Sequence, residues 1–164
     1  MMPAPGGLWH RRTVASWAEV VSAEPEFAER VRHLLAAHKH LTLATLRKDG
    51  SPRISGSELQ IEDGNLWLGM MTRSMKALDL RRDPRLALHS PSVDPPEGAE
   101  SGWLGDAKVA GRGVEVTEGE SPKDGHRFRI DITEVVLTRV GDPPDHLVIE
   151  SWHPGRGLEV RRRT

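Results

Sequence analysis

Residues 41–90 read LTLATLRKDGSPRISGSELQIEDGNLWLGMMTRSMKALDLRRDPRLALHS, and this stretch decides the fold. It contains two dipeptides, Asp49 with Gly50 and Asp63 with Gly64, of a kind that readily adopts the positive φ angles of a tight hairpin turn. The segments on either side alternate apolar and polar residues or run apolar, as strands do. The pattern predicts strands joined by hairpins over residues 41–46, 52–62 and 66–71.

Strand character ends near Thr72, where we predict a short basic helix that stops at Asp83 and Pro84, before a fourth strand over 85–90. The first turn of a helix carries unpaired N–H groups and partial positive charge. Ser74 adds a hydroxyl there and Lys76 adds a formal charge. A phosphate would fit this site, although a helix cap with solvated basic residues explains the same pattern.

The rest of the chain supports this unit. We expect a flexible leader over residues 1–15, two helices over 16–23 and from Pro25, and a functional or mobile loop over 91–102. Further strands are predicted over 107–118, 128–140 and 146–152, followed by a basic tail over 161–164. About seven strands in hairpin order, with glycines at the bends, favour one mainly β domain over 16–160, built as a small antiparallel barrel with peripheral helices.

The composition narrows the function. The chain has 164 residues, no cysteine and a net charge of -1, which excludes thiol chemistry and gives no indication of nucleic-acid or membrane binding. No apolar run is long enough for a signal peptide or a membrane span, so we expect a cytoplasmic protein. Three nearby histidines could suggest a metal site, but no carboxylate completes a ligand set and we predict no metal: His33, His38 and His40.

Two other histidines, His89 and His153, each end a predicted strand beside a loop. There an imidazole can donate a proton or a hydrogen bond to a ligand, or it can be an ordinary structural histidine. Trp103 and Trp152 are candidates for a wall of a substrate pocket or for a buried subunit seam.

Several motifs in order resemble the pyridoxamine 5'-phosphate oxidase-like family of FMN-binding split barrels, across roughly residues 30 to 140: residues 43–46, 49–53, 66–68, 74–76 and 83–88. The resemblance implies a six- or seven-stranded antiparallel split β-barrel that forms a homodimer with two flavin sites across the interface. By the same resemblance the flavin phosphate is held by Arg53, Ser74 and Lys76. The backbone of Ser55, Gly56 and Ser57, with Met70 and Met71, lines the isoalloxazine ring, and residues 107–113 of the partner chain close the site.

Two departures from the family pattern argue against oxidation of vitamin B6 itself. Met75 stands where these oxidases usually have an arginine, and residues 152–157 lack their Arg-x-His signature. We therefore predict an FMN-binding oxidoreductase that acts on another small organic molecule, with no nucleic-acid or membrane partner. The alternatives are a reductase that uses the deazaflavin coenzyme F-420, which would need extra cations such as Arg73 and Arg81, and a non-catalytic flavin or haem protein. A haem iron would take His89 or His153 as its axial ligand.

Overall fold

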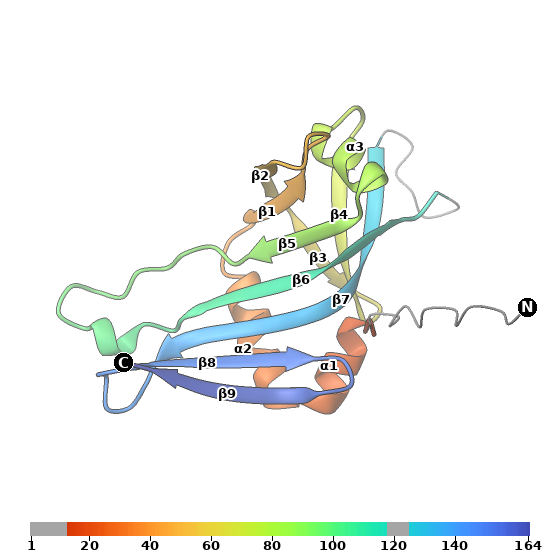
Figure 1. The fold of residues 1–164 in the computed structure, drawn as a ribbon. Coiled ribbons are helices and arrows are strands. Elements are labelled where there is room, and N and C mark those ends of the chain that lie inside the picture. Colours follow the sequence, from red (N-terminus) through yellow and green to blue (C-terminus); the bar gives the residue numbers. More distant parts are fainter. Residues whose placement is uncertain (1–12, 118–124) are drawn as a thin grey trace, which may run out of the picture.

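The computed structural model describes residues 13–117 and 125–164. Within these ranges the chain forms one nine-stranded antiparallel sheet, three α-helices and one short 3-10 turn (Figure 1). In chain order the elements are α1 (Trp17–Ala23), α2 (Pro25–Leu35), β1 (Leu41–Leu46), β2 (Pro52–Ser57), β3 (Leu59–Glu62), β4 (Asn65–Met71), α3 (Met75–Arg82), β5 (Arg85–His89), η1 (Glu100–Gly102), β6 (Asp106–Glu115), β7 (Gly125–Val140), β8 (Leu147–His153) and β9 (Gly157–Arg163).

The sheet curls without closing. Its main path is β2-β1-β5-β6-β7-β4-β3, so the two end strands, β2 and β3, follow each other directly in the chain. No ladder joins these two strands in the described residues. The result is an antiparallel split β-barrel, which confirms the predicted fold class.

The two hairpins follow the turn chemistry of the sequence. Gly50 has a φ of 84° in the turn between β1 and β2. Asp63 and Gly64 have φ values of 49° and 72°, and the flanking residues Glu62 and Asn65 are paired, which is the two-residue turn that keeps the twist of its strands. The single strand predicted over 52–62 is wrong at one point: it breaks at Glu58, because its first half pairs with β1 and its second half with β4.

The C-terminal end differs most from the prediction. The basic tail predicted over 161–164 is wrong, because β9 pairs with β8 up to Arg163. The chain reverses between β8 and β9 at a turn that contains Gly155 and leads into Gly157, the first residue of β9, and both glycines have a φ of 77°. The described residues therefore form nine strands, where six or seven were expected. Three consecutive arginines conceal a strand because they lack the alternation of apolar and polar residues that marks one.

The predicted leader over residues 1–15 lies mostly outside the described residues. Its last residue belongs to the body of the fold, since the N–H of Ala15 donates to the carbonyl oxygen of Ile132 at 2.9 Å, and the N–H of Ile132 donates to the carbonyl oxygen of Ala15 at 2.8 Å. Ser16 then caps α1, and its side chain exchanges hydrogen bonds with Glu19. The leader prediction is therefore wrong for this residue.

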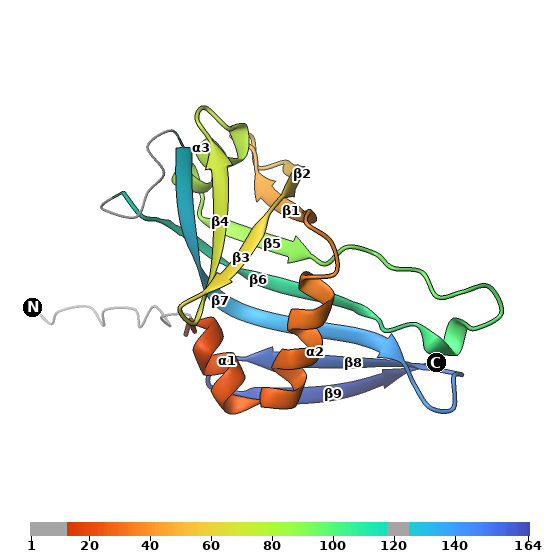
Figure 2. The same cartoon turned by 180° about the vertical axis from the view of Figure 1, so that it is seen from behind.

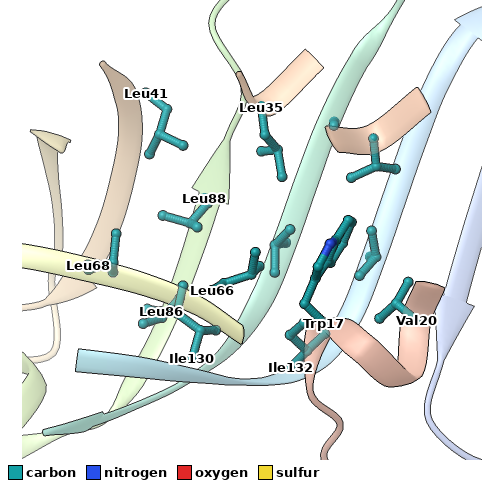
Figure 3. Close-up of a cluster of buried hydrophobic side chains, with 14 of the residues drawn as sticks. Trp17, Val20, Leu35, Leu41, Leu66, Leu68, Leu86, Leu88, Ile130 and Ile132 are labelled. Carbon is teal, nitrogen blue, oxygen red and sulfur yellow. The ribbon is translucent and has the colours of Figure 1, made fainter. Parts of the chain in front are cut away.

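Helices α1 and α2 cover one face of the sheet over β6, β7 and β8 (Figure 2). Trp17 and Val20 of α1 are buried there, close to Ile132 of β7 (Figure 3). Apolar residues at helical spacing give α2 its buried face, which includes Phe27, Val31, Leu34 and Leu35. None of the helices in the described ranges is long and apolar enough to span a membrane.

Candidate functional site

A cavity of about 500 Å³ lies where the barrel is split, between the end of β2, the strands β3 and β4, and the start of α3. We call it the split cavity. Its volume is within the range of small-molecule sites. Its lining residues are His40, Gly56, Ser57, Glu58, Gln60, Gly69, Met70, Met71, Ser74, Lys76 and Gly125. The structure thus brings together six of the eight predicted cofactor-binding residues: Gly56, Ser57, Met70, Met71, Ser74 and Lys76.

The start of α3 faces this cavity without a side-chain cap. The chain reverses after β4 at Arg73, which has a φ of 64°, and Ser74 occupies the N-cap. The Ser74 side chain makes no capping hydrogen bond, so its hydroxyl is available to a ligand. The first N–H groups of a helix also lack intrahelical partners, and the helix dipole is positive at this end. This end of the split cavity is therefore suited to an anion.

Lys76 is half-buried in the same corner. Its Nζ donates to the carbonyl oxygen of Gly56 at 2.6 Å, and no carboxylate pairs with it in the parts of the chain that the structure describes. Burial lowers the pKa of Lys76, because partial desolvation opposes its positive charge. A bound phosphate would supply the missing counter-charge. The carboxylate in the lining, Glu58, has partners of its own: its Oε1 lies 3.3 Å from Nζ of Lys39 and 3.4 Å from Nε2 of His40.

The strand walls of the split cavity are open enough for a flat ring. A Cβ added at Gly56 or at Gly69 would meet no atom within 4 Å. Two methionines of β4 also line the cavity: Met70 is buried, whereas Met71, at the end of the strand, is 83% exposed. A planar aromatic group can therefore approach the backbone of both strands and contact a polarisable thioether.

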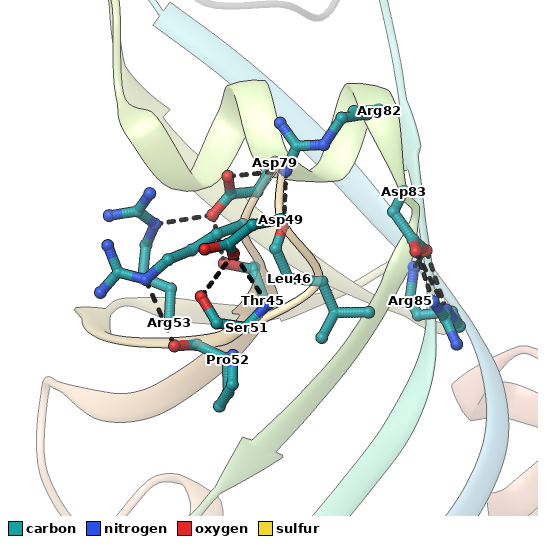
Figure 4. A network of polar contacts seen from close by, with 11 residues as sticks. Thr45, Leu46, Asp49, Ser51, Pro52, Arg53, Asp79, Arg82, Asp83 and Arg85 are labelled. Atoms are coloured by element: carbon teal, nitrogen blue, oxygen red, sulfur yellow. Dashed lines mark hydrogen bonds and ion pairs between the residues drawn. The ribbon is translucent and has the colours of Figure 1, made fainter.

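Arg53 lies outside the split cavity, in a buried polar network beside α3 (Figure 4). Its Nε donates to Oδ2 of Asp79 at 2.6 Å. Asp79 also accepts from Thr45 at 2.9 Å and from Arg82 at 3.0 Å. This network anchors α3 to β1 and β2. Arg53 borders a neighbouring cavity of about 540 Å³ with Met75 and the turn after β1, so its predicted contact with the flavin phosphate stays a prediction.

Ser55 is not among the lining residues of the split cavity either. The cavity begins at Gly56 and Ser57, the last two residues of β2, and Ser55 precedes them in the strand. A role for Ser55 would have to come from its backbone.

Sequence reasoning missed Asp79 and Thr45. The signal was present in two places: Thr45 continues the inward alternation of Leu41 and Leu43, and Asp79 adjoins Leu80 on the buried side of a helix. A carboxylate in such a position needs partners, and the nearby arginines supply them.

Comparison with known proteins identifies the family. A family model described as pyridoxamine 5'-phosphate oxidase matches residues 27–150. The chain belongs to this family. The resemblance indicated by residues 43–88 is therefore confirmed. A search of curated protein sequences finds no match.

Several solved structures share the fold of this pyridoxamine 5'-phosphate oxidase family member. PhzG from Burkholderia lata 383, in complex with tetrahydrophenazine-1-carboxylic acid, is 10% identical with a TM-score of 0.62, over 96% of this chain and 98% of that chain. A protein related to general stress protein 26, from Clostridium acetobutylicum, is 14% identical with a TM-score of 0.54, over 71% and 90%. A heme binding protein from Mycobacterium smegmatis is 17% identical with a TM-score of 0.50, over 82% and 86%.

In this family member the two candidate histidines lie away from the split cavity. His89 hydrogen-bonds through Nδ1 to the carbonyl oxygen of Ser90 at 2.7 Å, and its Nε2 lies 3.6 Å from Asp106. His153 contacts Oε1 of Glu134 through Nε2 at 2.9 Å. Each imidazole therefore has a structural partner within its own chain.

The two candidate tryptophans lie in different surroundings. Trp152 is 4% exposed and belongs to the hydrophobic core, so it does not line an open pocket of this chain. Trp103 is half-buried and lines a different cavity, at the far side of α2.

Proposed function

We propose that this chain binds FMN in the split cavity and acts as a flavin-dependent oxidoreductase on a small organic molecule. The observation that carries the proposal is Lys76, a half-buried cation without a carboxylate partner in the described residues, beside the uncapped start of α3 and the open strand faces at Gly56 and Gly69. Membership of the pyridoxamine 5'-phosphate oxidase family supports the same cofactor.

The proposal assigns each part of FMN to a different group of residues. Lys76, the Ser74 hydroxyl and the first N–H groups of α3 would hold the phosphate, since all of them are donors. The backbone of β2 and β4 would carry the ring at Gly56 and Gly69, with Met70 and Met71 at its edge. Bound FMN supplies the hydride or electron transfer, so this chain has to anchor the phosphate, exclude water from one ring face and orient the ring.

Exposed apolar side chains support a homodimer as part of this proposal. Ile54, Met71 and Met75 are 74%, 83% and 55% exposed, and all three lie on β2, at the end of β4 or at the start of α3, next to the proposed flavin site. Apolar side chains gathered in one region of the surface favour burial against a partner. A second copy there would cover the outer face of the ring.

The test compares two lysines on opposite sides of the α3 start. Lys76→Ala should weaken FMN binding about 10- to 140-fold, the loss expected for one charge-assisted hydrogen bond. Lys48→Ala is the matched control, because Lys48 borders the neighbouring cavity with Arg53. It should leave FMN affinity unchanged. Affinities are measured by quenching of flavin fluorescence, with circular dichroism to check that both variants fold.

The opposite pattern, with FMN lost in Lys48→Ala and kept in Lys76→Ala, would place the phosphate in the neighbouring cavity and overturn the assignment. Parallel titrations with coenzyme F-420 and with haem distinguish the cofactor. Activity is then tested by anaerobic addition of candidate substrates to the FMN-loaded protein, with loss of the oxidised flavin absorbance as the readout.

A further inference from the structure

A second cavity, of about 450 Å³, lies at the far side of α2 and shares no lining residue with the split cavity. We call it the α2 cavity. It lies between α2, the segment after η1 and the end of β7. Figure 2 shows α2 crossing in front of β7. Most of its walls are apolar, formed by Leu34, Trp103, Leu104, Leu137 and Val140. Leu104 is 63% exposed, although it is a large aliphatic residue. The α2 cavity is therefore suited to the apolar body of a small molecule.

Two arginines border this apolar space, and they share one carboxylate. Arg30 of α2 binds Glu150 of β8 through two hydrogen bonds of 2.6 and 2.7 Å. Arg139 of β7 donates to the same carboxylate from Nε at 3.1 Å. Two positive charges therefore face one negative charge, which is buried. The terminal nitrogens of the Arg139 guanidinium have no partner among the described residues, so they remain free to bind an anion.

One of the three terminal arginines, Arg162, adds to this charge. Val148 of β8 pairs with Arg139 on one side and with Arg162 of β9 on the other, so all three share one face of the sheet. That face is the one covered by α2, because Val148 is buried. Arg162 therefore adds positive charge to the face of the sheet that borders the α2 cavity.

The remaining charged groups in the lining do not cancel this excess. Glu29 is an acidic residue there, but it is held by Arg32 one turn along the helix, at 2.6 and 2.8 Å. His33 also borders the cavity, and it lies close enough to Glu29 to contribute, after Arg32, to lowering the pKa of that carboxyl group. The cavity thus combines an aromatic and aliphatic wall with a net positive rim.

We propose that the α2 cavity is a second ligand site, which binds a small organic carboxylate with an aromatic body. The ring lies against Trp103 and the leucines, and the carboxylate accepts hydrogen bonds from the terminal nitrogens of Arg139. A planar carboxylate matches a guanidinium in both charge and shape. This site is independent of FMN, because the two cavities share no residue.

Isothermal titration of the full chain with 2-naphthoate tests the site, and neutral 2-naphthalenemethanol is the matched probe. The wild type should bind the carboxylate more tightly than the alcohol. Arg139→Met should weaken 2-naphthoate binding by about tenfold or more, because it removes a charge-assisted contact and leaves Glu150 with Arg30. Arg161→Met is the control: Arg161 pairs with Ile149, so it lies on the opposite face of the sheet, and its loss should leave binding unchanged.

Two further variants keep the test decisive. Leu104→Glu places a negative charge in the cavity wall at an exposed position, so it should abolish 2-naphthoate binding without unfolding the protein. Lys76→Ala should leave 2-naphthoate binding intact. The proposal is overturned if 2-naphthoate fails to bind at millimolar concentration, if the alcohol binds equally well, if Arg139→Met matches Arg161→Met, or if Lys76→Ala removes binding.

Discussion

Replacement of Asp79 by asparagine probes the buried network that holds α3 in place. The Asp79 side chain is 2% exposed, and it accepts hydrogen bonds from Arg53, Arg82 and Thr45. Asparagine keeps the size of the side chain but removes its charge. The guanidinium groups of Arg53 and Arg82 then lose their counter-ion. We therefore expect α3 to be held less firmly against β1 and β2, together with Ser74 and Lys76 at its start.

The magnitude depends on how buried each partner is. The Arg53 side chain is 18% exposed, so its bond to Asp79 is shielded from water and contributes about 1.5–3 kcal/mol. The Arg82 side chain is 38% exposed, and solvent screening limits its contribution to about 0–1 kcal/mol. The free energy of unfolding should therefore fall by about 1.5–4 kcal/mol. At about 3 °C per kcal/mol for a chain of this length, Tm should fall by about 5–12 °C.

The pH dependence gives a second readout. Burial of Asp79 favours its neutral form, but the hydrogen bonds from Arg53, Arg82 and Thr45 outweigh burial and hold its pKa below the ordinary value. A lowered pKa stabilises the fold above the unfolded value of ~3.9, and this contribution is lost as pH falls toward the folded value. The difference between wild type and Asp79→Asn should therefore shrink below about pH 4.

Urea unfolding followed by circular dichroism measures both effects. Asp83→Asn, at the C-cap of α3, is the control: the side chain of its partner Arg85 is 61% exposed, so this substitution should cost much less stability. An unchanged midpoint for Asp79→Asn, or a loss no larger than that of Asp83→Asn, would refute the structural role of the network. Arg53→Met completes the series: a loss of stability with little change in FMN affinity assigns Arg53 to the network, whereas a loss of affinity equal to that of Lys76→Ala would show that it contacts the phosphate.

Two other predictions concern the open faces around the split cavity. Gly69→Val should abolish FMN binding in a fluorescence titration while the barrel keeps its stability, because the added side chain enters open space. Gly102→Val is the control, since Gly102 is also open but lies outside that cavity. FMN retention by Gly69→Val would contradict the proposed ring position. Ile54→Glu should convert the proposed dimer to a monomer in light scattering without loss of stability, since Ile54 is 74% exposed. Val160→Glu, at an exposed position on β9, is the control and should leave the dimer intact. A dimer that persists in Ile54→Glu would rule out this face as the interface.

Short-range chemistry explains which parts of the fold could be predicted from the sequence. The dipeptides at Asp49 and Asp63 fold into the expected turns, and Ser74 starts the expected helix. In each case the information lies within a few residues: a positive φ, a cap or a proline. The order of motifs over residues 43–88 was sufficient to indicate the family.

Long-range pairing explains what was missed. The segment 161–163 lacks the pattern of a strand, and it becomes one because β8 offers it an unpaired edge. Similarly, the strand expected over 52–62 divides at Glu58 because its two halves find different partners on opposite sides of the barrel opening.

The sequence by itself determined the turns, the helix starts and the placement of Ser74 and Lys76, the proposed anion site, at the start of a helix, because these depend on neighbours in the chain. Only the tertiary structure decided which charges meet. Arg53 and Lys76 both approach the start of α3, yet Asp79, 26 residues from Arg53, binds one of them and leaves the other without a carboxylate partner in the described residues. Electrostatic pairing depends on distance in space and on burial, and neither can be read from the order of residues.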